Sequence, residues 1–105
     1  MNLMNEKKIE GLLGMAQRAG KTASGDVAIR KAIASGQAAA LIVAQDVSER
    51  TKESLLKEAS EKNIPVHAIL MKDTLGQCLG KEYRAAVALL DKGFANALEK
   101  ELRDR

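Results

Sequence analysis

Two short apolar runs constrain the fold of this chain more than any other feature. The sequence of residues 38–44 is AAALIVA, and that of residues 84–90 is RAAVALL. Uninterrupted runs of this length are typical of strands that are buried on both faces of a sheet. Both runs fall well short of the roughly 20 apolar residues that span a membrane. We therefore expect a covered sheet and no membrane-spanning segment.

Segments with helical periodicity separate these strands. Two further strands are predicted, a short one at residues 21–24 and another at residues 66–70. Strands that alternate with helices indicate an α/β fold with a largely parallel sheet covered on both faces. At 105 residues, the chain has the usual length of one domain, which we place at residues 1–105. Helices are predicted over residues 7–19, 24–36, from 46 or 48 to 63, from 73 or 74 to 80, and from 91 onward.

The same pattern predicts which residues each helix buries and which residue caps it. The predicted buried residues are Ile9, Leu12, Leu13, Ala16 and Ala19 in the first helix, Ile29, Ala32 and Ile33 in the second, Leu55, Leu56 and Ala59 in the third, and Phe94, Leu98 and Leu102 in the last. The predicted N-terminal caps are Ser24, then either Asp46 or Ser48, then either Asp73 or Thr74, and finally Asp91.

Cysteine and histidine, which often serve as catalytic residues or metal ligands, are scarce in this chain. Cys78 is the only cysteine and His67 the only histidine, which excludes a disulfide framework and a cysteine- or histidine-based metal site. We expect Cys78 to pack as a small hydrophobic residue, since a nucleophilic thiol would need His67 as its base. His67 is expected at a sheet edge or in the core, where its ring would be hydrogen-bonded. Neither an enzyme nor a bound cofactor is expected.

Residues 14–22 (GMAQRAGKT) resemble a phosphate-binding P-loop. The resemblance fails because five residues separate the two glycines, where a P-loop has four. The segment also ends a helix, whereas a P-loop follows a strand and begins a helix. Nucleotide hydrolysis is therefore not predicted.

Positive charge is concentrated at one end of the chain. Residues 1–31 hold six basic and three acidic residues, whereas the remainder holds 11 of each, so this segment carries the whole net charge of +3. Such an excess suits a polyanionic partner, and it equally suits an ordinary solubilising surface. The lone cysteine, and the lack of an apolar segment after residues 1–8, indicate a cytoplasmic protein.

Residues 21–36 (KTASGDVAIRKAIASG) are one candidate binding segment. The helix that begins within it offers free N–H groups and a positive dipole end to a phosphate. At 100° per residue, Arg30 and Lys31 face solvent, with Lys21 just upstream, and form a local basic surface. Val27 also faces outward, either as an incidental surface residue or as a contact for an RNA sugar or base.

The turn at residues 80–84 (GKEYR) is a second candidate. Tyr83 can stack on an exposed base while Lys81 and Arg84 contact phosphates. The alternative is a solvated turn in which Tyr83 covers the edge of the sheet.

Five stretches resemble a known family in their order and spacing. They are KTASGDVAIRKAIASG, LIVAQDVSERTK, NIPVHAI, LGQCLGKEYRAAVALLD and GFANAL, all between residues 9 and 98. The chain resembles the L-seven-Ae (kink-turn-binding) ribosomal protein family, and within it the small bacterial YlxQ-type branch. This resemblance implies a three-layer α/β/α sandwich with a four-stranded mixed sheet. It also implies binding to kink-turn RNA, a bent helix with tandem sheared G·A pairs.

The family signature G-x-N-E-x-x-K, at the start of the second helix, is only partly present. By resemblance Gly25 matches the Gly and Lys31 the Lys, but Val27 and Ala28 stand at the Asn and Glu positions. The family's Asn and Glu help to read the G·A pairs, and each lost contact to a base edge costs about 1–3 kcal/mol of discrimination. Losing both predicts recognition weaker by roughly two orders of magnitude unless other contacts replace them. The family's second contact loop corresponds to residues 80–84.

These observations predict a non-enzymatic RNA-binding protein of ribosomal type that binds kink-turn-like or bulged RNA. We expect a cytoplasmic monomer that binds structured RNA, with ribosomal RNA as one candidate target, and that has no DNA or membrane partner. The alternative is a protein-interaction module on the same fold with weak or no kink-turn specificity. The predicted RNA-binding residues are Lys21, Ser24, Gly25, Asp26, Val27, Ala28, Arg30, Lys31, Lys81, Glu82, Tyr83 and Arg84.

Overall fold

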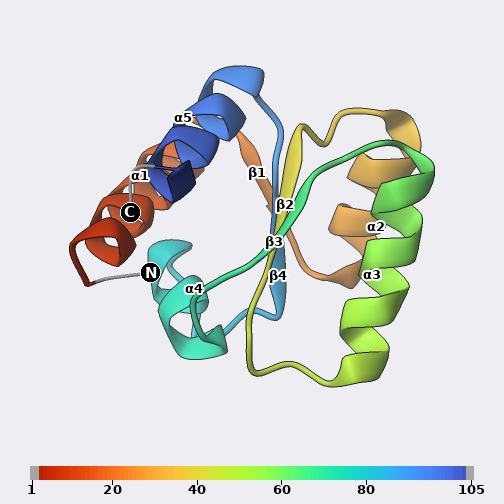
Figure 1. Cartoon of the computed structure of the whole chain (residues 1–105), viewed down its shortest axis with the longest axis horizontal. Helices are drawn as coiled ribbons and strands as arrows, with labels where there is room; N and C mark the ends of the chain where they lie inside the picture. The colour runs from red at the N-terminus through yellow and green to blue at the C-terminus, as the bar shows by residue number, and fades with distance from the viewer. Residues whose placement is uncertain (1–2, 104–105) are drawn as a thin grey trace.

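A computed structural model describes residues 3–103, which form a sheet between two layers of helices (Figure 1). Helices α1, α4 and α5 cover one face of the sheet, and α2 and α3 cover the other. The three-layer α/β/α sandwich implied by the family resemblance is therefore confirmed. The elements are α1 (Leu3–Arg18), β1 (Thr22–Ser24), α2 (Asp26–Ser35), β2 (Ala40–Val43), α3 (Glu49–Glu61), β3 (Val66–Ala68), α4 (Lys72–Cys78), β4 (Ala86–Leu89) and α5 (Lys92–Arg103).

The sheet has the strand order β1-β4-β2-β3. Strand β4 is antiparallel to both of its neighbours, and only β2 and β3 are parallel. The mixed sheet is confirmed, but the largely parallel sheet inferred from the alternation of strands and helices is wrong. The reason is that α4 does not carry the chain back along the sheet. Strand β4 therefore starts at the end of the sheet where β1, β2 and β3 finish.

The two apolar runs form the central strands, as their composition predicted. Every residue of β2 and of β4 is buried, and each strand contributes side chains to the hydrophobic core on both faces. Most of the predicted helix stripes are buried against these strands as well. Phe94 and Leu102 are half-buried against the core, and Ala19 and Leu56 are exposed. Ala19 is exposed because α1 already ends at Arg18, and Leu56 is 46% exposed because α3 packs through Leu55 and Ala59.

The helix caps explain where several elements begin. The N–H of Thr51 donates to Ser48 Oγ at 3.2 Å, so Ser48 caps α3. Asp46, the other candidate, instead accepts a hydrogen bond from the N–H of Lys72 at 2.8 Å. This bond ties the start of α4 to the segment after β2, and the prediction that Asp73 or Thr74 caps α4 is wrong.

The last helix begins as predicted. Asp91 Oδ1 accepts hydrogen bonds from the N–H groups of Gly93 at 2.6 Å and Phe94 at 3.2 Å. Within residues 3–103, the helices are all too short or too polar to cross a membrane.

Candidate functional site

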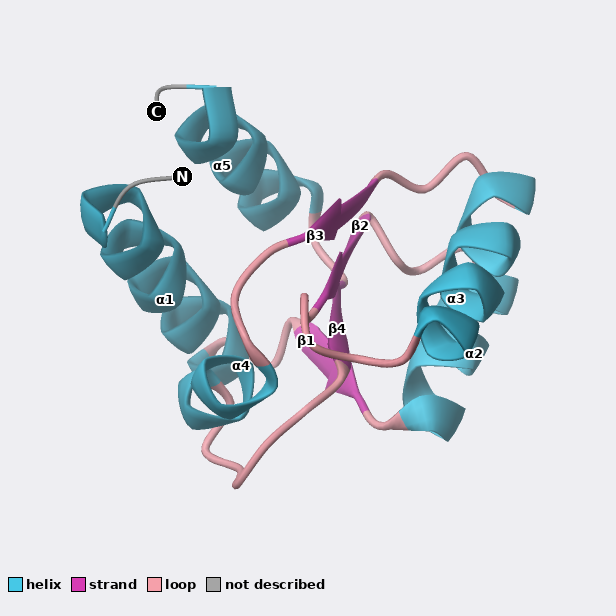
Figure 2. Cartoon of the chain, turned by 60° about the horizontal axis from the view of Figure 1, so that its bottom comes forward, coloured by secondary structure: helices cyan, strands magenta, loops and turns pink. Residues whose placement is uncertain are grey.

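Segments that lie far apart in the sequence meet at the end of the sheet where β4 begins. Ser24, the last residue of β1, pairs with Val87 of β4, so the start of α2 lies beside the loop that precedes β4. Figure 2 brings this end of the sheet toward the viewer. The start of α3 reaches the same end, because β2 is parallel to β1 across β4. The site is therefore built from two helix starts and one loop.

These segments border a groove of about 210 Å³. Ile29 of α2, Leu55 of α3 and Ala86 of β4 are buried and give the groove an apolar floor. Gly25, Asp26, Thr51, Tyr83, Arg84 and Ala85 also line it. The structure thus brings both predicted binding segments to one hollow, although they were identified separately.

The N-terminus of α2 has no side-chain cap. Gly25 occupies the cap position with φ of 92°, a value that L side chains rarely adopt. Ser24 was predicted to cap the helix and does not, because its hydroxyl belongs to β1 and accepts a hydrogen bond from Arg84 Nε at 3.2 Å. Without a side-chain cap, the first N–H groups of the helix are available to an anion.

The outer face of α2 carries the family signature positions. Val27 is 80% exposed, and Ala28 and Lys31 are exposed as well. Lys31 follows Val27 by four residues and Ala28 by three, so these three positions form one surface on the outer side of α2. The predicted buried side, Ile29, Ala32 and Ile33, is confirmed.

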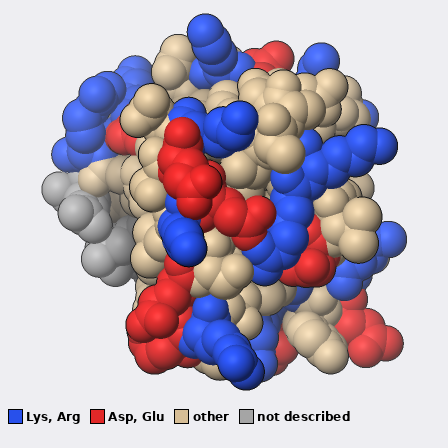
Figure 3. Space-filling model, turned by 90° about the vertical axis from the view of Figure 1, so that its right-hand side faces the viewer, with Lys and Arg blue, Asp and Glu red and all other residues tan. Residues whose placement is uncertain are grey.

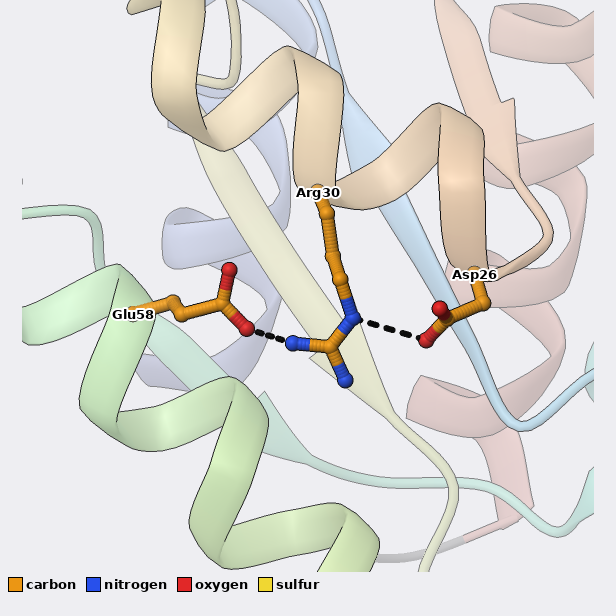
Figure 4. A network of polar contacts seen from close by, with 3 residues as sticks. All are labelled: Asp26, Arg30 and Glu58. Atoms are coloured by element: carbon orange, nitrogen blue, oxygen red, sulfur yellow. Dashed lines mark hydrogen bonds and ion pairs between the residues drawn. The ribbon is translucent and has the colours of Figure 1, made fainter.

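Arg30 does not belong to that free basic surface. Its Nε lies 2.8 Å from Asp26 Oδ1, and its Nη1 pairs with Glu58 of α3 (Figure 4). The prediction that Arg30 stands beside Lys31 as a solvent-facing cation is corrected, because two carboxylates balance its charge. Over α2 and α3, basic side chains are interspersed with acidic ones and do not form one continuous patch (Figure 3).

Lys21 lies at the opposite end of β1. Its carbonyl accepts a hydrogen bond from the N–H of Leu90, just beyond the end of β4. At about 3.3 Å per extended residue, the backbone of Lys21 is about 13 Å from that of Gly25. The structure therefore does not bring Lys21 together with the other predicted site residues.

Loop 80–84 is held tightly against α4. The N–H of Lys81 donates to the carbonyl of Gly76 at 2.8 Å, and that of Arg84 donates to the carbonyl of Lys72 at 3.1 Å. A Cβ on Gly76 would lie 2.4 Å from Tyr83 Cα, so only glycine permits this approach. The loop is therefore a preformed part of the surface.

Three side chains of this loop point outward. Tyr83 is 58% exposed, and Lys81 and Glu82 are exposed too. Lys72 Nζ lies 5.9 Å from the centre of the Tyr83 ring, a favourable cation–π distance. Tyr83 thus borders the groove and contacts α4, rather than covering an edge strand.

Sequence reasoning missed Lys72, Gly76, Thr51 and Leu55 as parts of this site. Thr51 and Leu55 lie within or next to a stretch that resembles the family, but only the pairing of the strands places α3 at the groove. The available signal for Gly76 was a glycine inside a short predicted helix, where glycine is unfavourable and often serves close packing.

The residues considered for catalysis do not form a catalytic pair. His67 lies on the edge strand β3, where its Nε2 is 2.7 Å from Glu99 Oε1 of α5. Burial, reinforced by the negative charge of Glu10, raises the pKa of Cys78 from 9.0 to about 11. Cys78 is therefore a neutral thiol at pH 7. No group of three or more potential metal ligands occurs among residues 3–103.

Comparison with known proteins identifies the family. Residues 7–99 match the model of the Ribosomal protein L7Ae/L30e/S12e/Gadd45 family. The chain belongs to this family. The resemblance inferred from the sequence is thus confirmed, and membership of a family of ribosomal proteins supports a non-enzymatic protein.

Two individual proteins are similar to this chain over most of their length. The chain is 34% identical over 87 residues to the RNA-binding protein YlxQ of Bacillus subtilis, covering 83% of this chain and 87% of the relative. It is 33% identical over 95 residues to the RNA-binding protein YlxQ of Enterococcus faecium, covering 90% and 91%.

Solved structures agree with the fold. A Bacillus halodurans C protein of unknown function superposes with a TM-score of 0.87 at 31% identity, covering 91% of this chain and 97% of that one. The Giardia lamblia 15.5kD RNA binding protein superposes with a TM-score of 0.78 over 99% of this chain and 89% of that one. At 16% identity, the Giardia protein supports the fold alone.

Gly76→Ala is predicted to displace loop 80–84, because the added methyl group would overlap the Tyr83 backbone. We expect a loss of about 1–3 kcal/mol in the free energy of unfolding. Tyr83 is the only tyrosine and the chain lacks tryptophan, so its fluorescence should also change. Gly11→Ala is the control: apart from its chain neighbours and the backbone of its own helix, no atom lies within 4 Å of the added Cβ, and alanine in a helix should stabilise by up to about 1 kcal/mol. Unchanged Tyr83 fluorescence in Gly76→Ala would contradict the tight packing.

The raised pKa of Cys78 predicts slow alkylation. In the folded chain the rate with iodoacetamide should rise toward its plateau near pH 11, whereas in the urea-unfolded chain it should do so near pH 9. Because the folded pKa is the higher one, this thiol contributes stability that is complete below pH 9 and lost as the pH rises through about 11. Equal alkylation rates for folded and unfolded chain at pH 8 would contradict the assignment.

Proposed function

We propose that this protein is a non-enzymatic RNA-binding protein of ribosomal type, which recognises kink-turn-like or bulged structured RNA. The observation that carries the proposal is the shared groove between the α2 N-terminus and loop 80–84. Relatives at 34% and 33% identity are named RNA-binding proteins, which supports the same conclusion. The proposal covers one domain at residues 1–105.

Each side of the groove has a chemical task in this proposal. The uncapped N–H groups at the start of α2 bind a phosphate, and Lys31, Lys81 and Arg84 add positive charge around it. The exposed ring of Tyr83 offers a stacking surface to an unpaired base, with Lys72 beneath as a supporting cation. Such contacts favour a bent or bulged RNA, in which unstacked bases are accessible.

Val27 and Ala28 change how that RNA is read. Neither side chain can donate or accept a hydrogen bond, so base-edge contacts at the family's Asn and Glu positions are lost. Affinity then rests on phosphate contacts and on stacking at loop 80–84. Phosphate contacts release counterions, and we expect affinity to fall steeply as salt rises.

The proposed partner is structured RNA, with ribosomal RNA as one candidate, and not DNA or a membrane. We further propose that the protein acts as a monomer in the cytoplasm. The RNA assignment rests on the family match and on the shape and chemistry of the groove.

Binding to a kink-turn duplex and to a straight duplex of equal length, measured by fluorescence anisotropy at moderate salt, tests the specificity. Tighter binding to the kink-turn is expected, and equal affinities would contradict kink-turn recognition. An absence of binding to both RNAs, together with a protein partner retained after RNase treatment, would favour the protein-interaction module on the same fold.

Substitutions at the groove test the assigned residues. Lys31→Ala should weaken RNA binding by about tenfold, equivalent to about 1.4 kcal/mol, and reduce the salt dependence by about one phosphate contact. Tyr83→Ala should cost about 1–3 kcal/mol of binding free energy, while Tyr83→Phe keeps the stacking ring and most of the affinity. The control is Lys57→Ala, an exposed lysine on α3. Unchanged RNA affinity in both Lys31→Ala and Tyr83→Ala would refute the site.

A further inference from the structure

The basic excess of residues 1–31 is divided between the two helical layers. Lys8 and Arg18 lie on α1, on the face of the sheet opposite to α2 and Lys31. Both line a groove of about 510 Å³ between α1 and α5, which the proposed RNA site does not use. We propose that this groove docks an acidic amphipathic helix of a partner protein.

The floor of the α1–α5 groove is apolar. Gly11, Leu12 and Met15 of α1 and Ala97 of α5 line it. Met15 is 51% exposed, although the α1 residues that face the sheet, such as Ile9, are fully buried. An exposed apolar side chain in a hollow is a characteristic of surfaces that bind a partner.

The groove has the length and direction that a helix needs. Its α1 residues, from Lys8 to Arg18, are spaced three or four apart and form one stripe along the helix. At 1.5 Å per residue, the stripe is about 15 Å long, or nearly three helical turns. A neighbouring hollow shares Leu12 and Ala97 and adds Phe94, so the apolar floor continues toward the start of α5, where Asp91 accepts the hydrogen bonds that cap this helix. A partner helix would lay apolar residues at i, i+3, i+4 and i+7 along this floor.

The rim of the groove determines the charge of the partner. Lys8, Arg18 and Lys100 are exposed, and none forms an ion pair with another residue of the described chain. The one acidic residue at the groove is Glu101. Its Oε2 is buried and lacks a hydrogen-bond partner within residues 3–103, so it can accept one hydrogen bond from a ligand, and the three rim cations outnumber this one carboxylate. The rim therefore favours acidic flanks on the docked helix.

Other occupants fit these features less well. A second copy placed face to face would bring the three rim cations against themselves, which is repulsive. RNA would contact the charged rim but would leave the exposed Met15 side chain without an apolar partner. An acidic helix with apolar residues on one side matches both the rim and the floor.

A synthetic amphipathic peptide tests the proposal with the full-length protein. The labelled peptide carries leucine at heptad positions a and d and glutamate at the other positions, and its twin carries lysine in place of glutamate. We expect saturable binding of the acidic peptide, weakened by salt, and no binding of the lysine twin. Equal binding of both peptides, or binding of neither, would overturn the proposal.

Variants of the protein locate the binding. The double variant Lys8→Glu, Lys100→Glu should weaken peptide binding by about tenfold or more, because both rim charges are reversed. Met15→Ser should also weaken peptide binding, because it removes an apolar contact from the floor of the groove while every charge stays in place. Lys57→Glu on α3 is the matched charge control and should bind the peptide normally. A loss in Lys57→Glu equal to that in the double variant would overturn the assignment to this groove.

The two proposed surfaces can be separated in the same experiment. Lys31→Ala should leave peptide binding unchanged, and the double variant should leave kink-turn affinity unchanged. If the double variant weakens RNA binding and not peptide binding, the groove belongs to the RNA surface and the helix proposal is wrong. A dimer in sedimentation that is lost in Met15→Ser would likewise replace the partner helix with a second copy.

Discussion

The candidate site depends on the position and direction of β4. This strand lies between β1 and β2, is antiparallel to both, and is buried along its whole length. Because it runs opposite to β1, its beginning lies beside the end of β1. That arrangement places the first turn of α2 next to loop 80–84, and the Arg84 guanidinium bonds to a serine 60 positions earlier in the sequence. Gly76 then lets the loop lie directly on α4, so the surface exists before any ligand arrives.

The role of the charged residues becomes clear only from their positions in the fold. The basic excess at the N-terminal end looks like one patch in the sequence, but α1 and α2 lie on opposite faces of the sheet. Arg30 is paired with Asp26 and Glu58, and Lys21 lies at the far end of β1. Arg84 remains as a cation that lines the groove, with Lys81 in the same loop and Lys31 on the outer face of α2, while Lys8, Arg18 and Lys100 line a different hollow. One feature of the sequence thus supports two separate surfaces.

Features that depend on residues close together in the sequence could be predicted. The central strands were evident because uninterrupted apolar runs suit burial on both faces, and Ser48 and Asp91 were recognisable as caps. Strand direction was not predictable from alternation, since it depends on where α4 returns the chain. Ser24 was misassigned for a related reason: a serine before a helix looks like a cap until the opposite strand delivers Arg84 to its hydroxyl. The groove itself results from strand pairing over long sequence distances, and the family resemblance indicated only that residues 80–84 form a second contact loop.

The central claim is that RNA contacts the surface formed by α2 and loop 80–84. Photo-crosslinking of a kink-turn RNA to the full chain, followed by mass spectrometry of the attached peptides, tests it most directly. We predict crosslinks within residues 25–31 and 80–84, with Tyr83 as a principal attachment point. Crosslinks confined to α1 and α5, with none at α2 or loop 80–84, would contradict the account.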